Sequence, residues 1–203
     1  MKTTSQKIST LFLICLIALA ITGYTYSHWT DMIHIFSTVN MAHLEITIYD
    51  QKLIPDIGYN KNTNYNKTLL IEDHIATGWE LWVGIIIKNH GTLPATITHY
   101  QITKNILFGN ETHFYGPYTT VPTEVWCDLS QTNLPPPASP PPPGETTPPI
   151  DLPIGDKLVV WQKIWLQNPL PPEFAGTTIT CEYFATFSGW YDRVTVIYDL
   201  YKR

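Results

Sequence analysis

Apolar and polar residues alternate in several short segments of this chain, which is the pattern of half-buried β-strands. The first such segment is His43–Asp50, where Leu44, Ile46 and Ile48 share one face. Trp79–Lys88 alternates in the same way but carries apolar residues on its other face as well, which predicts a central strand. Further segments rich in Thr, Val, Ile and aromatic residues are Thr68–Glu72, which is weaker, Pro94–Thr103, Phe114–Cys127, Leu158–Gln167, Thr177–Phe187 and Arg193–Tyr201.

These segments amount to about eight strands. Outside the first twenty or so residues, no stretch shows a 3.6-residue apolar period with helix caps. The pattern therefore predicts an all-β fold, a jelly-roll-like β-sandwich, with residues 43–203 as its single domain.

The N-terminus has the pattern of a signal peptide. Lys2 and Lys7 lie in a polar stretch, and an uninterrupted apolar run, Leu11–Ile21, follows them. Ala18 and Ala20 are spaced as at a processing site, so residues 1–20 are predicted to form a leader helix cut after Ala20. The run would span about 16 Å as a helix, well short of a hydrocarbon core of about 30 Å. The alternative is an uncleaved N-terminal anchor, and in either case the leader is the only part expected to contact a membrane.

A proline-rich stretch interrupts the strand pattern. Residues 134–153, LPPPASPPPPGETTPPIDLP, contain ten of the seventeen prolines of the chain. Because proline fixes φ and lacks an N–H donor, this stretch is predicted to be a stiff surface insertion without helix or strand. The alternative is a spacer or a ligand for aromatic grooves.

Composition favours an extracellular protein and disfavours binding to nucleic acid. The 203 residues include 12 Lys and Arg against 17 Asp and Glu, a net charge of −5, so no basic field would attract a phosphate backbone. Only 14% of the residues are charged. An uncharged polar surface, together with the leader, favours a secreted or cell-surface protein.

Two cysteines and two sequons are candidate modification sites of an exported chain. Cys127 and Cys181 remain once Cys15 has left with the leader, and we expect either a disulfide between them or two buried, inert thiols. Asn66 and Asn110 each begin an N-x-T sequon, and are either glycosylated or plain polar loop residues.

Catalytic and metal-binding patterns are sparse. The seven histidines form neither an H-x-H nor an i, i+4 pair, and the chain has no G-x-S-x-G, P-loop or G-x-G-x-x-G motif. We therefore expect no enzyme, no metal site and no cofactor.

At the level of whole segments, the chain resembles a family of fibre proteins. The start of the chain is similar to that of TasA/camelysin-type proteins: it has a leader, then Gly23–Phe36, then the strand His43–Asp50. In that family the leader is removed by a SipW-like signal peptidase. Trp82–Ala95 (WVGIIIKNHGTLPA) and Asp156–Gly189 resemble segments of archaeal bundling-pilus subunits of that family.

The resemblance implies an exported subunit of an extracellular filament, a pilus or a biofilm-matrix fibre. Subunits of this kind polymerise by donor-strand complementation, so the partners would be other copies of the chain in a head-to-tail filament. The extension 21–42 would supply the donor strand, with either Tyr24 and Tyr26 or Ile33 and Ile35 alternating as required. The alternative for these residues is a first strand of the subunit's own sandwich, or a stalk to a retained anchor.

Two other functions fit parts of the pattern. One is a membrane-anchored binding module at the cell surface, whose aromatic loops around Trp126 or Trp190 would contact glycans or envelope proteins. The other is a pilin cut before its apolar segment, which is disfavoured because Ile follows Lys7 where such chains usually have Gly.

Overall fold

A computed structural model describes residues 12–20, 42–55, 60–63, 66–126, 137 and 144–202. The chain divides into two compact units, Met1–Met41 and Ala42–Arg203. In the first unit, residues 12–20 form the predicted leader helix. Among the described residues, no helix is both long and apolar enough to cross a membrane.

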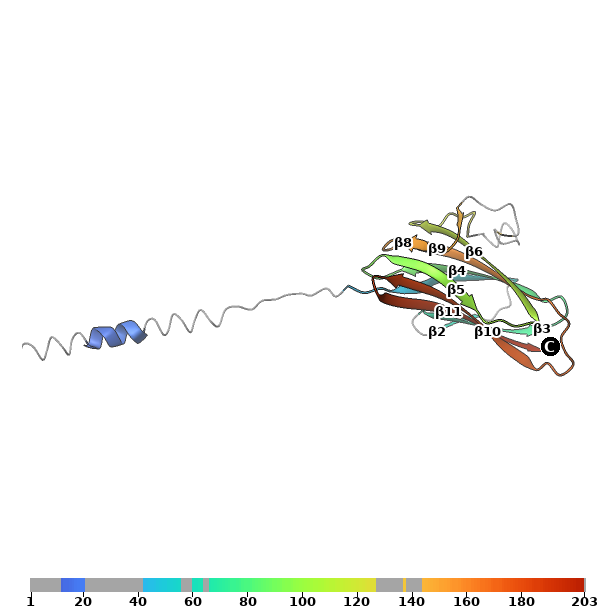
Figure 1. Cartoon of the computed structure of the whole chain (residues 1–203), viewed down its shortest axis with the longest axis horizontal. Helices are drawn as coiled ribbons and strands as arrows, with labels where there is room; N and C mark the ends of the chain where they lie inside the picture. The colour runs from blue at the N-terminus through green and yellow to red at the C-terminus, as the bar shows by residue number, and fades with distance from the viewer. Residues whose placement is uncertain are drawn as a thin grey trace, which may run out of the picture. The chain divides into compact units, whose positions relative to one another are not determined.

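The second unit is a β-sandwich, which confirms the predicted fold class (Figure 1). Eight strands have eight or more residues, in agreement with the expected number: β1 (Ile46–Ile54), β3 (Thr68–Ile75), β4 (Glu80–Asn89), β5 (Ala95–Ile102), β6 (Phe108–Tyr118), β9 (Lys157–Leu166), β10 (Gly176–Phe187) and β11 (Trp190–Lys202). Three short strands extend the sheets: β2 (Asn60–Thr63), β7 (Glu145–Thr146) and β8 (Ile150–Leu152).

The strand order is that of an immunoglobulin-type sandwich. One sheet has the order β1-β4-β9-β6-β7, and the other has the order β2-β3-β11-β10-β5-β8. Numbered along the chain, β1, β4, β9 and β6 take the places of strands A, B, E and D, while β5, β10 and β11 take those of C, F and G. β3 is an addition that pairs in parallel with β11. Alternation of apolar residues predicts the two layers but not this connectivity.

Two segment predictions were wrong. The strand expected at Phe114–Cys127 is β6, which begins at Phe108 and ends at Tyr118, because Pro117 and Pro122 lack the N–H groups that would extend the ladder. The last part of the proline-rich stretch also contains the short strands β7 and β8. Both pair with only one neighbour, and such edge positions tolerate proline nearby.

The core lies between the two sheets and is built from the alternating residues that the sequence pattern marked. It includes Ile46 and Ile48 of β1, Ile85 and Ile87 of β4, and facing residues of β9, β10 and β11. Strand β4 is buried on both faces, as its pattern predicted.

A second apolar cluster covers the outer face of the five-stranded sheet. Its members are Trp82, Ile86, Tyr115, Val125, Val159 and Trp161, with Trp126 packed against them. The indole Nε1 of Trp161 donates a hydrogen bond to the Val125 carbonyl oxygen at 3.0 Å. The segment after β6 therefore covers this face.

Candidate functional site

The side of the sandwich at β5 and β6 is open for part of its length. Strand β8 pairs with β5 only at Ala95–Ile97, and β7 pairs with β6 only at Phe114–Tyr115. In the described part of the chain, no strand pairs with the outer edge of Thr98–Ile102 or with that of Phe108–His113. Unpaired N–H and C=O groups of this kind form a template for another strand.

On the opposite side of the sandwich, the start of β1 is bound to the other sheet. The Ile48 amide donates to the Asn66 carbonyl oxygen at 2.7 Å, which ties β1 to the turn before β3. Lys67 forms an ion pair with Asp192 and donates to the Ile46 carbonyl oxygen, and Asp192 accepts the Ile46 amide at 2.7 Å. The start of β1 is thus bound to the start of the last strand.

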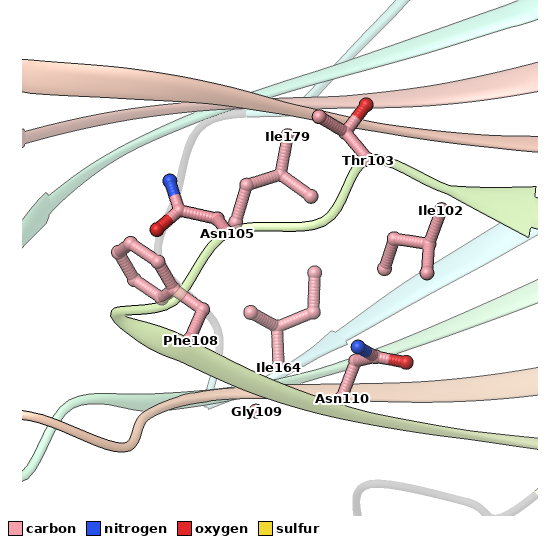
Figure 2. Close-up of a pocket in the computed structure, with 8 residues that line it drawn as sticks. All are labelled: Ile102, Thr103, Asn105, Phe108, Gly109, Asn110, Ile164 and Ile179. Atoms are coloured by element: carbon pink, nitrogen blue, oxygen red, sulfur yellow. The ribbon is translucent and has the colours of Figure 1, made fainter.

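A small pocket lies between the two open edges, where β5 turns into β6 (Figure 2). The side chains of Ile102, Ile164 and Ile179 converge on it from β5, β9 and β10, and Phe108 closes one side. Asn110 and the loop residues Thr103 and Asn105 line its rim. Its enclosed volume is about 10 Å³, which is room for one water molecule and for no larger ligand.

Tyr100 limits the pocket on the other side. Its ring lies 5.4 Å from that of Phe114 and 6.2 Å from that of Tyr183, measured between centroids, so it spans the gap between the sheets. The side chain remains 36% exposed. The gap is therefore filled near Tyr100 and open only near the β5–β6 loop.

Buried polar side chains lie behind the open side. Tyr198 donates from Oη to Oε1 of Gln162 at 2.6 Å, and Gln162 donates from Nε2 to Oγ1 of Thr112 at 3.5 Å. Burial raises the pKa of Tyr198 well above its usual value, so its hydroxyl stays protonated and remains a donor. The groups satisfy one another, which indicates a structural role.

The extension joins the sandwich at the end opposite the pocket. The His43 amide donates to Oγ1 of Thr92 at 2.9 Å, and the Thr92 amide donates to the His43 carbonyl oxygen at 3.0 Å. We call this the entry end. The β5–β6 loop, residues 103–107, forms what we call the far end. The eight residues of β5 separate the two ends by about 26 Å.

The predicted site residues differ in what the structure describes. Tyr24, Tyr26, Ile33, Ile35 and Cys127 lie outside the described residues. Ala20 is the last described residue of the leader helix.

Cys181 is a free thiol, fully buried on the core face of β10. Burial raises its pKa to about 11, which disfavours the reactive thiolate form. The disulfide with Cys127 stays a prediction.

Both sequon asparagines are exposed. Asn66 lies in the turn before β3, with a φ of 60°, and Asn110 lies in the unpaired part of β6. Glycosylation of either residue stays a prediction.

The two tryptophans proposed for binding lie in different surroundings. Trp126 is partly buried, with its ring 5.5 Å from that of Trp161, whereas Trp190 is 49% exposed at the β10–β11 turn. No group of three or more metal-ligating side chains occurs within the described ranges.

Sequence reasoning missed the open edges. Each strand reads as an ordinary alternating segment, and whether its edge is paired depends on partners far away in the chain. The polar run Asn-Glu-Thr at 110–112 inside β6 indicates exposed side chains but not whether the backbone edge is paired.

Comparisons with known proteins identify no family. No family model matches the chain, and no curated protein matches it. Similar solved structures include the Vibrio cholerae VesB protease, with 11% identity and a TM-score of 0.39 over 66% of this chain and 30% of that one. A family 123 glycoside hydrolase from Clostridium perfringens has 12% identity and a TM-score of 0.39, over 79% of this chain and 27% of that one.

The N-terminal domain of PorA has 15% identity and a TM-score of 0.32, over 78% of this chain and 98% of that one. This chain spans less than a third of the first two structures.

Proposed function

We propose that this chain is an exported structural subunit of an extracellular filament, a pilus or biofilm-matrix fibre, whose copies are joined by donated strands. The observation that carries the proposal is the position of the unpaired edges, Thr98–Ile102 and Phe108–His113, toward the end opposite the attachment of the extension. A donor at one end and an acceptor at the other make the contact head-to-tail. Such a contact need not close, and repetition yields a filament.

The leader supports export. Its helix carries apolar side chains that are more than half exposed, Phe12, Leu13, Ile14, Leu16, Ile17 and Leu19. An apolar helix that includes Ala18 and Ala20, spaced as at a processing site, fits recognition and removal by a signal peptidase. Removal would free the extension from the membrane, and assembly would then begin outside the cell.

The sandwich supports strand addition. An incoming strand would satisfy the free N–H and C=O groups of an open edge, and its alternate side chains would cover the apolar pocket. The pocket itself is too small to hold a substrate. A structural role for the open side therefore agrees better with its geometry than a catalytic one.

A second candidate is a surface-anchored binding module. The observation that favours it is the exposed aromatic pair Trp190 and Tyr191 at the β10–β11 turn, 49% and 57% exposed. Aromatic rings of this kind stack on sugar rings or on apolar protein surfaces.

The test is to express the full chain with its leader, sequence the processed N-terminus, and image the exported material by negative-stain electron microscopy. We expect a terminus near Ile21 and thin filaments. A matched variant with residues 21–41 deleted, so that the leader is followed by Ala42, should be exported as a monomer. A chain that begins near Ile21 and forms no filaments would contradict the proposal, and a terminus still at Met1 would favour the anchored module.

A further inference from the structure

The open side offers two edges to an incoming strand, and they differ in regularity. Strand β5 has a register irregularity against β10 between Phe184 and Ala185, which falls at the start of its free part. Strand β6 pairs with β9 in unbroken register from Phe108 to Tyr115. Because bulges twist an edge away from new partners, β6 is the better template.

Strand β6 already accepts a strand at the next positions. Glu145–Thr146 of β7 pairs antiparallel with Phe114–Tyr115, on the same outer edge. A strand added at Phe108–His113 would continue the line of β7 toward the far end. The unpaired part of β6 thus adjoins the two residues of this edge that β7 covers.

We propose that the free edge of β6, Phe108–His113, accepts residues 30–35 of a second copy in antiparallel pairing, with Ile35 beside Phe108 and Ile33 beside Asn110. The inference rests on the proposed function and adds the acceptor edge, the direction of the donor and its register. The occupant is a second copy of this chain.

Chain direction follows from where the extension joins the sandwich. The extension leaves at the entry end, next to Thr92, and β6 begins at the far end. When the entry end of one copy meets the far end of another, donor residues closest to Ala42 lie near Phe108, and earlier residues lie farther along β6. The donor therefore runs opposite to β6, which is the direction that β7 already takes.

Chain length selects between the two candidate donor pairs. At about 3.3 Å per residue, the stretch from Ile35 to Ala42 bridges up to about 23 Å, enough to reach from one copy into the next. The free edge Phe108–His113 is only about 17 Å long. With Ile35 beside Phe108, Tyr26 would fall opposite Pro117, beyond the free edge and past the positions that β7 occupies. Ile33 and Ile35 reach the free edge with a connection of 7 residues from Ile35 to Ala42, whereas Tyr24 and Tyr26 in the same places would need one of 16 residues, from Tyr26 to Ala42, so the isoleucines give the shorter connection.

Side-chain chemistry agrees with this register. Phe108 and Phe114 are core residues, so by alternation Asn110 and Thr112 face the same side, toward the pocket. Donor side chains in line with Phe108 and Asn110 would lie over the apolar pocket residues Ile102, Ile164 and Ile179. Isoleucine would cover these apolar residues and would add no polar group of its own.

The experiment is disulfide trapping in the full exported chain with Cys127→Ser to remove one native thiol. In the proposed register, Met32 of the donor and Glu111 of β6 would lie opposite each other, both on the outward face. Met32→Cys with Glu111→Cys should therefore give a ladder of covalent multimers on non-reducing gels. Met32→Cys with Gln101→Cys, on the exposed outer face of the β5 edge, is the matched control and should give monomers.

A second pair of variants tests the register without cysteines. Ile33→Asp with Ile35→Asp should abolish filaments, and Tyr24→Asp with Tyr26→Asp should retain them, while both leave the thermal unfolding of the sandwich unchanged. Covalent multimers from Met32→Cys with Gln101→Cys would overturn the inference. Filaments of Met32→Cys with Glu111→Cys that give no covalent multimers would overturn it as well. Either result would leave the filament proposal unaffected. Absence of filaments in the unmodified chain would overturn both.

Discussion

Trp161 lies against Gly84 of the neighbouring strand, so closely that a Cβ at position 84 would come within 2.7 Å of the indole ring. The ring has little freedom to move, because it is fully buried and its Nε1 donates to the Val125 carbonyl oxygen. The same Cβ would lie 2.9 Å from Trp126. Gly84 is thus required for the segment after β6 to cover the outer face of the sheet.

Gly84→Ala should destabilise the sandwich by about 1–3 kcal/mol, since the added methyl group forces the two indole rings apart. In a domain of this size, each kcal/mol of lost stability lowers the melting temperature by roughly 2–4 °C. Circular dichroism measures this fall. The control is the same substitution in a Trp126→Ala background, where one of the two clashes is gone and the cost should be smaller. Equal costs in both backgrounds would contradict this account.

Lys67→Met should cost about 1–2 kcal/mol, because it leaves the partly buried Asp192 without its cation and removes the donor to the Ile46 carbonyl oxygen. Urea unfolding measures the change. Glu80→Gln is the matched control. Glu80 forms an ion pair with Lys163 at 3.1 Å, but its side chain is 57% exposed. Exposed ion pairs contribute little to the free energy of unfolding, so this variant should lose little stability. If both variants lose the same stability, the Lys67–Asp192 pair does not hold β1 to β11.

The layers and most strands of this protein could be predicted from sequence, since each needs only local alternation. Ile85 and Ile87, for example, mark the core face of β4 without any knowledge of its neighbours. Strand pairing is different. Lys67 and Asp192 are separated by 125 positions, and neither carries a local signal of the other. The open edge of β6 was beyond prediction for the same reason, because it is defined by how far the distant strand β7 extends.

Cys181 should resist thiol reagents in the native protein. Burial raises its pKa to about 11, so little thiolate exists at pH 8 and the reagent has no access. Titration with Ellman's reagent should detect no reaction of Cys181 in Cys127→Ser until guanidinium unfolds the chain. The unmodified chain, unfolded without reductant, tests the predicted disulfide. If both Cys127 and Cys181 then react with the reagent, the disulfide is excluded, and if neither reacts, it is established.

Alkaline pH should weaken the fold through Tyr115. Burial raises the pKa of this phenol to about 12 from a usual value of 10, with Glu145 as a further cause. Because the unfolded chain loses the proton first, the stability contributed by the neutral phenol is complete below pH 10 and is lost as the pH rises through about 12.

Tyr115→Phe is the informative variant for this pH dependence. Among the described residues, the buried Tyr115 hydroxyl has no hydrogen-bond partner, so we expect its removal to leave the stability at pH 7 unchanged and to reduce the loss of stability between pH 10 and 12. Urea unfolding at a series of pH values measures both effects. Tyr183→Phe is a poor control because burial raises the pKa of that group as well.

Glycosylation at Asn110 and strand addition at β6 should exclude each other. Asn110 is exposed, begins a sequon and lies in the middle of the free edge, where a bulky glycan would keep a second strand away. Asn66 lies in a turn beside β1, on the opposite side of the sandwich, so a glycan there leaves the edge of β6 free.

In a host that glycosylates such sequons, mass spectrometry of peptides from purified filaments should find Asn110 unmodified, whatever the state of Asn66. The monomer fraction should be enriched in chains that carry a glycan on Asn110, and Asn110→Gln should shift these chains into filaments. Asn66→Gln is the matched control and should leave the distribution unchanged. Filaments rich in Asn110 glycan would show that the strand enters elsewhere, because six residues of edge cannot hold both a glycan at their centre and a paired strand along their length.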